Sequence, residues 1–561
     1  MKEPSKFSWE IAEQELDFKR GGLINIGWYC TDRICLLGKA AKTALIHEDS
    51  GGITRSYSFN DLRLASNTAG TFLTRLGLRN GDRICLFMDR TPDLYFYFLG
   101  ALKAGIIVQP LFSAFGDESL FVRLKDAGTR AVITQQKHLF KIRKIRDRLP
   151  SLEFIIITDH PAEKELTDRE LAADLSSMAL SEQMEVYPSG PHTPSILHYT
   201  SGTTGQPKGV IHTHYSLVSQ YFTAKHVLDL KEDDIYWCTA DPGWVTGTSY
   251  GIIGPWSAGV TQCILDMNFS ATRWYEFIEK RKITVWYTAP TAIRYLMKAG
   301  PGLLGKYCLS SLRHLCSVGE PLNAAAVKWS QKYLGKPFHD TFWQTETGSI
   351  MICNLPGMEI KPGSMGKPFP GIESTLLDPV THVPLKTPGV AGMMAFRPGW
   401  PAQMTGYWND NVKYREKFID GWYVTGDRAM TDNDGYYWFI GRDDDVINTG
   451  GHLVSPFEVE SALLEHPAVA ESAVIAKPDV MMMEVVKAYV SLKPGFDKQD
   501  GLDLEIMNLL RKKLSPLAMP QEIEFIDHLP KTRSGKIMRR YLHMKEWHEK
   551  EQDLSGLDTE D

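Results

Sequence analysis

The sequence has 561 residues, of which 43% are hydrophobic and 23% are charged, and its formal net charge is −6. This length exceeds one typical domain, so we expect two or more globular units with ample cores. The small negative charge provides no basic field and argues against nucleic acid as the main partner. No apolar run is long enough to span a membrane, and the N-terminus lacks the apolar stretch of a signal peptide.

The eight cysteines are scattered through the chain without a CxxC pair. Neither a zinc knuckle nor a disulfide framework is therefore indicated. Free thiols of this kind are typical of a reducing compartment, and we predict a cytoplasmic protein.

Short apolar runs alternate with helical patterns over the first 320 residues. Expected strands are 83–88, 105–111, 130–134, 152–157, 196–199, 235–239, 284–287 and 314–318. The pattern at 93–103 predicts a helix, and each of the later four runs leads through a turn into a helix-like segment. This alternation predicts an α/β fold with parallel sheet, in which ligands favour the loops at strand ends.

The residue pattern of the sequence changes at two points in the second half of the chain. Short strand-like runs separated by Pro and Gly residues predict a small β-rich subdomain at about 365–440. After the charged break at Arg442–Asp445, a helix (457–465), two strands (470–475 and 485–492) and a second helix (502–514) indicate a compact α+β domain. We therefore predict a large N-terminal domain, 1–443, of parallel and mixed sheets with helices, and a small C-terminal domain, 444–561.

The segment Tyr199–Gly209 is the most informative loop of the chain. Its glycines allow successive backbone N–H groups to converge, while its hydroxyl groups and the ammonium group of Lys208 add donors. This composition predicts an anion-binding loop. It is not the common P-loop, because no Ser or Thr follows the lysine directly.

At these residues the chain resembles the adenylate-forming superfamily of acyl-CoA synthetases, adenylation domains and luciferases. The resemblance continues through further segments in the expected order. These are Asp241–Gly247, Ser317–Pro321, Trp343–Gly348, Gly421–Asp427, Gly441–Arg442 and Pro530–Lys536. The residues of Asp241–Gly247 and Trp343–Gly348 are most similar to those of short bacterial acetyl-CoA synthetases.

The resemblance implies an AMP-forming acyl-CoA synthetase with two half-reactions. A carboxylate first attacks the α-phosphate of ATP, giving acyl-AMP and pyrophosphate, and coenzyme A then takes the acyl group and releases AMP. Three alternatives remain. One is a ligase for a larger cyclic, aromatic or medium-chain acid, run in either direction. The others are an adenylating enzyme with a carrier-protein acceptor and a non-catalytic sensor of nucleotide or acyl-CoA.

The resemblance also assigns a nucleotide site with magnesium. Lys536 is the mobile lysine that stabilises charge in the first half-reaction, and Glu346 anchors Mg²⁺, a cation that prefers hard oxygen ligands. Asp427 accepts hydrogen bonds from the ribose hydroxyls. The full nucleotide set is Thr200, Ser201, Gly202, Thr203, Thr204, Lys208, Gly319, Glu320, Pro321, Asp340, Thr341, Phe342, Trp343, Gln344, Thr345, Asp427 and Arg442, with Thr200, Glu346 and Lys536 as the catalytic residues.

The acid and the coenzyme are assigned to other positions by the same resemblance. The implied acyl pocket consists of Val245, Thr246, Val318 and Trp343, and the indole closes it to long chains, which favours acetate or propionate. The implied coenzyme A contacts are Ala292, Gly451 and Arg511. Asp444 matches the hinge about which the small domain reorients between the half-reactions. Oligomeric state is open between monomer and homodimer.

Two residues depart from the family pattern. Leu453 stands where an arginine usually approaches the ATP phosphates, and leucine cannot form hydrogen bonds, so we expect weaker binding of ATP or pyrophosphate. Met483 stands where a glycine is common, next to other methionines that form an adaptable apolar patch.

Overall fold

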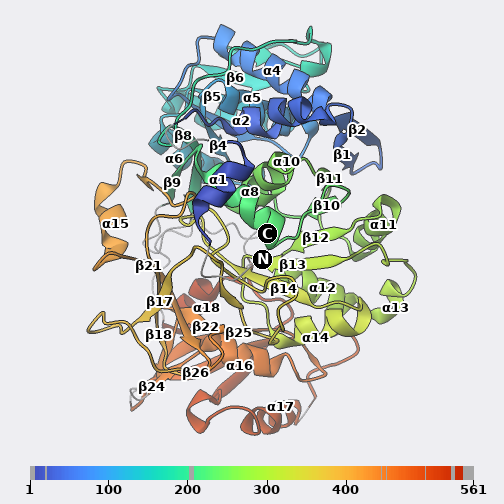
Figure 1. Cartoon of the computed structure of the whole chain (residues 1–561). Coiled ribbons are helices and arrows are strands. Elements are labelled where there is room, and N and C mark those ends of the chain that lie inside the picture. The colour runs from blue at the N-terminus through green and yellow to red at the C-terminus, as the bar shows by residue number, and fades with distance from the viewer. Residues whose placement is uncertain are drawn as a thin grey trace.

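The computed structural model describes residues 7–18, 22–200, 207–443, 445–449, 452–479, 481–499, 501–531 and 537–547. The side chains of residues 452 and 453 are not described, so the predicted role of Leu453 lies outside what the structure shows. Four sheets make up the strand content of the described residues. Figure 1 shows the N-terminal part of the chain at one end of the molecule, the central part in the middle and the C-terminal part at the other end.

A nine-stranded sheet forms the middle of the molecule, in the order β16-β15-β14-β13-β12-β10-β11-β1-β2. Its strands are β1 (Thr43–Asp49), β2 (Thr54–Ser58), β10 (Ile235–Cys238), β11 (Thr261–Asp266), β12 (Val285–Thr288), β13 (His314–Val318), β14 (Phe338–Phe342), β15 (Ile352–Cys353) and β16 (Lys367–Pro368). The six strands from β14 to β1 run parallel to one another. The strands β2, β15 and β16 each pair antiparallel with the strand next to them. The carboxyl ends of β12, β13 and β14 therefore lie together.

An eight-stranded sheet has the order β19-β9-β8-β4-β3-β5-β6-β7. Its strands are β3 (Arg83–Phe87), β4 (Ile107–Pro110), β5 (Ala131–Thr134), β6 (Phe154–Ile157), β7 (Glu170–Ala172), β8 (Pro194–Thr200), β9 (Lys208–Thr213) and β19 (Gly406–Tyr407). The expectation of a helix-like segment after β8 was wrong. The next described element is β9, which returns antiparallel to β8, because its apolar residues Val210 and Ile211 continue the sheet.

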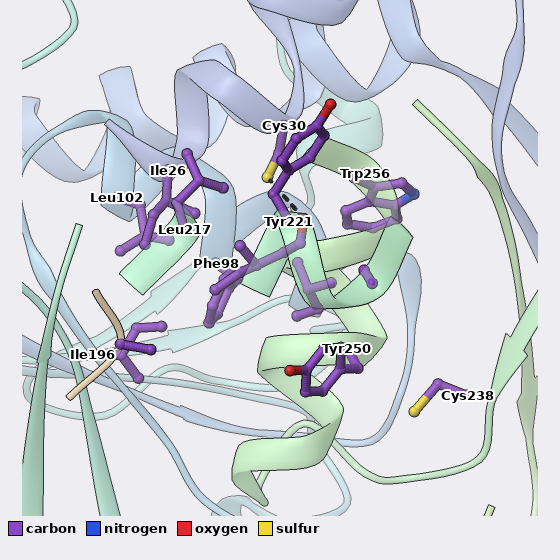
Figure 2. Packing of buried hydrophobic residues seen from close by; sticks show 14 of the residues in the cluster. Ile26, Cys30, Phe98, Leu102, Ile196, Leu217, Tyr221, Cys238, Tyr250 and Trp256 are labelled. Carbon is purple, nitrogen blue, oxygen red and sulfur yellow. Dashed lines mark hydrogen bonds between the residues drawn. The ribbon is translucent and has the colours of Figure 1, made fainter. Parts of the chain in front are cut away.

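Helices pack between these two sheets and build the main core. They include α2 (Ile26–Cys30), α4 (Phe59–Arg75), α5 (Pro92–Lys103), α8 (Ser216–His226) and α10 (Gly254–Ser257). Figure 2 shows Phe98 and Leu102 of α5, Leu217 of α8 and Trp256 of α10 among the converging side chains. Helix α5 touches α4 closely at Gly100, where an added Cβ would lie 2.4 Å from the carbonyl oxygen of Ser66.

The remaining helices of the large domain are peripheral or lie beside the nine-stranded sheet. They include α1 (Trp9–Glu15), α6 (Asp117–Ala127), α7 (Leu139–Ile145), α9 (Val245–Thr248), α11 (Ala271–Arg281), α12 (Pro290–Ala299), α13 (Pro301–Leu304), α14 (Ala324–Tyr333) and α15 (Asn411–Glu416). No helix in the described part of the chain is long and apolar enough to cross a membrane.

A five-stranded antiparallel sheet follows the nine-stranded sheet in sequence. Its strands are β17 (Ser374–Leu377), β18 (Gly392–Phe396), β20 (Phe418–Ile419), β21 (Trp422–Thr431) and β22 (Tyr437–Arg442). This sheet is the β-rich unit expected at about 365–440, although β16 within that range belongs to the nine-stranded sheet.

The C-terminal part of the chain is a small domain with its own sheet and core. Its elements are β23 (Ile447–Thr449), β24 (His452–Val454), α16 (Pro456–Leu463), β25 (Val469–Asp479), β26 (Met483–Leu492), α17 (Leu502–Arg511), β27 (Glu522–Phe525) and α18 (Arg539–Trp547). The predicted fold class is confirmed: a large domain of mixed sheets and helices precedes a small one rich in strands. Helix α18 begins at Arg539, two residues after Ile537, which forms a β-bridge with Lys531.

The turn between β25 and β26 carries backbone strain at Met483. This residue has a φ of 66° and an exposed side chain, so it occupies the left-handed region without obvious packing in return. Such a conformation costs a residue with a Cβ roughly 1–2 kcal/mol, whereas glycine adopts it freely. A glycine at position 483 would adopt this φ without strain.

We therefore expect Met483→Gly to stabilise the β25–β26 hairpin by about 1 kcal/mol, or about fivefold slower hydrogen exchange of its amides. Native-state exchange is the measurement, because a chain of this size does not unfold in two states. Met482→Gly is the control, since Met482 precedes Met483 in the same turn but does not have a positive φ. Exchange as fast in Met483→Gly as in the unmodified protein would contradict the assignment of strain.

Candidate functional site

The hairpin of β8 and β9 presents the first part of the candidate site. Thr200 ends β8, Lys208 begins β9, and the two are paired in register. The predicted phosphate-loop residues Ser201, Gly202, Thr203 and Thr204 lie between them, outside the described residues. Burial, followed by the charges of Lys413 and Lys417, lowers the pKa of Lys208. The ammonium group lies over the ring of Tyr407, 5.5 Å from its centroid.

Glu346 lies on the turn after β14 and faces the same hairpin. The hydroxyl of Tyr407 donates a hydrogen bond of 2.9 Å to Oε1 of Glu346. The backbone N–H of Met404 donates to the carbonyl of Glu346 at 3.0 Å. Tyr407 in turn belongs to β19, which pairs with β9. The side chain of Tyr407 therefore contacts both Lys208, which the sequence assigned to phosphate, and Glu346, which it assigned to magnesium.

The carboxyl ends of β13 and β14 bring two predicted nucleotide segments together. Val318 pairs with Thr341, so Gly319–Pro321 and Phe342–Thr345 leave the sheet side by side. The hydroxyl of Thr341 donates to the carbonyl of Ser317 at 2.8 Å. Gly319 has a φ of 95°, a conformation that glycine adopts without strain. Burial raises the pKa of Asp340, in β14, to about 7.

Asp427 is held against the turn after β14 by one side chain, Gln344. The amide Nε2 of Gln344 donates to Oδ2 of Asp427 at 2.6 Å, and its Oε1 accepts from the hydroxyl of Tyr423 at 2.8 Å. Asp427 is 7% exposed, and burial raises its pKa to about 7, while the guanidinium of Arg442 opposes the shift. Arg442 is the register partner of Asp427 across β21 and β22.

The predicted acyl pocket residues gather beside this turn. Val318 and Trp343 are buried in one apolar cluster, and Val245 packs against it. The indole of Trp343 makes an edge contact with Tyr250, centroid to centroid 5.1 Å, and its Nε1 donates to the hydroxyl of Tyr287 at 3.1 Å. Thr246 lies next to Val245 in α9. The indole is thus fixed in position by two tyrosines.

Ala292 and Arg511, the two predicted coenzyme A residues that the structure describes, are not brought together. Ala292 lies in α12 of the large domain, and Arg511 is the last residue of α17. Figure 1 shows α17 at the outer edge of the small domain, away from α12. Gly451, the hinge residue Asp444 and Lys536 lie outside the described residues. Glu320 has a further contact with α12, since Arg294 forms an ion pair of 2.6 Å with its Oε2.

Three contacting residues escaped the sequence reasoning. They are Tyr407, Tyr423 and Tyr287, which contact Glu346, Gln344 and Trp343 respectively. Tyr423 lies inside a recognised segment, Gly421–Asp427, so its position carried a signal. Tyr287 lies in the expected strand 284–287, and Tyr407 lies in a turn-like stretch with Gly406 and Asn409 for which no element was predicted.

Comparison with known proteins gives the family. Residues 37–408 match the model "AMP-binding enzyme", and residues 458–536 match "AMP-binding enzyme C-terminal domain". The chain belongs to the AMP-binding enzyme family. It is 46% identical to an acetyl-coenzyme A synthetase of Bacillus subtilis, over 98% of this chain and 96% of the relative. It is also 39% identical to an acetyl-coenzyme A synthetase of Rubrobacter xylanophilus, over 93% of this chain and 84% of the relative.

Two solved structures share the fold of this chain. A Brucella canis acyl-CoA synthetase is 33% identical, with a TM-score of 0.75 and coverage of 98% of both chains. An anthranilate CoA ligase in complex with anthranoyl-AMP is 30% identical, with a TM-score of 0.83 and coverage of 97% of this chain and 99% of that one. The resemblance that the sequence motifs indicated is confirmed.

If Asp427 binds the ribose, its raised pKa makes nucleoside binding depend on pH. The ionised carboxylate accepts both hydroxyls, and a group of pKa about 7 is roughly nine-tenths ionised at pH 8 and one-tenth at pH 6. We expect the dissociation constant of adenosine to rise about tenfold from pH 8 to pH 6. Adenosine replaces AMP in this calorimetric measurement, because the phosphate itself titrates near pH 6, at about the second pKa of phosphate esters.

Two matched variants separate the effect of Asp427 from that of a second buried aspartate, Asp340. Asp427→Asn should bind weakly with little pH dependence, whereas Asp340→Asn should keep the dependence, although burial also raises the pKa of Asp340 to about 7. Loss of the dependence in Asp340→Asn instead would contradict the assignment.

Proposed function

We propose that this chain is an AMP-forming acyl-CoA synthetase for a short-chain acid, acetate or propionate. It converts the carboxylate and ATP into acyl-AMP and pyrophosphate, and then acyl-AMP and coenzyme A into acyl-CoA and AMP. The observation that carries the proposal is the convergence of Lys208 at the start of β9, Glu346 on the turn after β14 and Asp427 within β21, since the charge of Glu346 acts on both of the other groups. Near full-length similarity to acetyl-coenzyme A synthetases supports the choice of coenzyme A as acceptor.

In the first half-reaction these groups bind, orient and neutralise charge. Lys208 and the hydroxyl of Thr200 face the leaving phosphates, and Asp427 holds the ribose, so that the α-phosphate meets the carboxylate of the substrate in line. Catalysis of phosphoryl-group chemistry depends chiefly on such positioning and on charge stabilisation. Lys536 supplies the remaining positive charge at the carboxylate and the α-phosphate.

The donor set fits a magnesium ion held jointly with ATP. Glu346 offers one carboxylate on a turn fixed by Tyr407, and Thr345 neighbours it. Mg²⁺ in nucleotide sites is commonly bound by one or two carboxylates together with substrate phosphates rather than by a protein cage. No cluster of three or more His, Cys, Asp or Glu is present among the described residues, which agrees with that mode. The ion would neutralise the phosphate charge.

The second half-reaction requires the small domain to move. We propose that residues 1–443 and 444–561 are the two bodies and that Asp444 is the hinge between them. The separation of Ala292 from α17 supports this proposal, since the present arrangement does not bring Ala292 and Arg511 together. The eight free cysteines, six of them buried, support a cytoplasmic location.

A larger, aromatic acid is the second candidate substrate. One structural neighbour is an anthranilate CoA ligase with a TM-score of 0.83, so this fold accommodates an aromatic acid in that protein. Trp343 distinguishes the two candidates, because its buried indole, held by Tyr250 and Tyr287, closes the pocket.

A coenzyme A ligase assay over a panel of carboxylates, run forward and backward, tests the function. We expect acetate or propionate to be the best substrate and Lys536→Ala to abolish acyl-AMP formation while thioester formation from supplied acyl-AMP is nearly intact. Lys545→Ala is the control, since this exposed lysine of α18 pairs with Glu524 and lies over the ring of Tyr489, both in the small domain. Acyl-AMP formation without acyl-CoA would favour a carrier-protein acceptor, and equal loss of both steps in Lys536→Ala would contradict the role of the lysine.

Removal of the indole should lengthen the acids that the enzyme accepts. In Trp343→Gly we expect kcat/KM to rise for acids of four to six carbons and to fall for acetate, since each methylene in an apolar pocket is worth about 1–3 kcal/mol. Trp329→Leu is the control, because Trp329 is equally buried, 8% exposed, but lies in α14 in another cluster. An unchanged chain-length profile in Trp343→Gly would show that the indole does not line the pocket.

A further inference from the structure

One side chain of the small domain reaches across to the large domain beside the site. Nζ of Lys531 donates to the hydroxyl of Tyr295, in α12, at 2.8 Å, and to Oε1 of Glu471, in β25, at 2.6 Å. The ammonium group also lies over the ring of Tyr295, 4.5 Å from its centroid. Lys531 therefore joins the two domains through a hydrogen bond and a cation–π contact with the same tyrosine.

This contact is largely shielded from water. The side chains of Lys531 and Glu471 are only 15% and 9% exposed, and Tyr295 is half-buried with Phe269 packed on its ring at 5.3 Å. A hydrogen bond to a charged group in such surroundings is worth more than one at an open surface, because removal of one partner leaves a desolvated charge less well satisfied.

The contact lies at the base of the segment that carries Lys536. Lys531 and Ile537, the described residues on either side of that segment, pair as an isolated antiparallel bridge. Two residues farther on, Arg539 forms an ion pair of 2.6 Å with Glu460 of α16. The charge of Glu320, which follows β13 in the nucleotide site, also raises the pKa of Arg539. The flank at Lys531 thus contacts the large domain, and the flank at Arg539 lies within electrostatic reach of Glu320.

The rest of this interface is less tightly packed. A cavity of about 30 Å³ remains between the domains, lined by Arg294, Met297 and Lys298 of α12 and by Leu464, Val469 and Lys493 of the small domain, among others. Interfaces between domains of one chain permit relative motion unless they are large and apolar. Beside this incompletely filled gap, the polar contact of Lys531 with Tyr295 helps to hold the small domain on the large one.

We propose that Tyr295 is a positioning residue: its contact with Lys531 is a latch that holds the small domain in the arrangement used for acyl-AMP formation. The latch must open before coenzyme A reacts, so it favours the first half-reaction over the second. This inference rests on the proposed two-step function. It concerns the relative populations of the two domain arrangements that serve the two half-reactions.

The first test is Tyr295→Phe, which removes the hydroxyl and keeps the ring. Acid-dependent ATP–pyrophosphate exchange should fall about tenfold in kcat, with the KM for ATP little changed, since no group at the nucleotide is altered. Acyl-CoA formation from supplied acyl-AMP should be unchanged or faster. Tyr307→Phe is the matched control, because Tyr307 is also half-buried but packs on Tyr275 within the large domain.

The outcomes of this test separate the latch from the proposed function. A normal exchange rate in Tyr295→Phe, or equal losses in both half-reactions, would overturn the latch while leaving the function intact. Absence of acid-dependent exchange in the unmodified protein would instead overturn the proposed function.

A reversible cross-link provides a second readout that does not depend on the strength of one hydrogen bond. Tyr295→Cys and Lys531→Cys are combined with Cys308→Ser, which removes the exposed native thiol. After reaction with a short linker carrying two methanethiosulfonate groups, the protein should form acyl-AMP but not acyl-CoA, and reduction should restore acyl-CoA formation. A cross-linked protein that makes acyl-CoA, or one that makes no acyl-AMP but still performs thioester formation, would overturn the proposal.

Discussion

The hydrogen bonds of one amide side chain, Gln344, fix the geometry on which the candidate site depends. Its Nε2 donates to Asp427 and to the carbonyl of Thr425, and its Oε1 accepts from Tyr423. Gln344 follows β14 of the nine-stranded sheet, while its partners all lie in β21 of the β-rich sheet. Glu346 follows Gln344 by only two residues. The carboxylate proposed for ribose, Asp427, and the carboxylate proposed for magnesium, Glu346, are therefore fixed relative to each other by the same turn.

The eight-stranded sheet is joined to the same turn by other contacts. His212 of β9 contacts the carbonyl of Thr345 through Nε2 at 2.7 Å, and Tyr407 of β19 contacts Glu346. Gly348 makes this approach possible, since its φ is 67° and an added Cβ would lie 2.7 Å from the His212 ring. Three sheets thus meet at one turn, whereas the small domain rests on an incompletely packed face. A rigid nucleotide frame with a movable neighbour is suited to two reactions at one site.

Much of the secondary structure could be predicted from local pattern. The expected strands at 83–88, 235–239 and 314–318 correspond to β3, β10 and β13 within a residue or two at their ends. The error at β9 arose because a glycine-rich loop after a parallel strand usually leads into a helix, and only pairing with β8 and β19 reveals the hairpin. Tyr407 was missed for the same reason, since its partner Glu346 lies 61 residues away.

The sequence by itself determined the chemistry available: a lysine after a glycine-rich loop, a glutamate and an aspartate in recognisable segments, and an indole beside them. These are local features, and they were sufficient to predict the family. Only the tertiary structure decided which groups meet and in what state. Burial against distant strands raises the pKa of Asp427 to about 7, and Lys531 meets Tyr295 across 236 residues of sequence. Burial and long-range contact depend on the packing of the whole chain, so no local pattern encodes them.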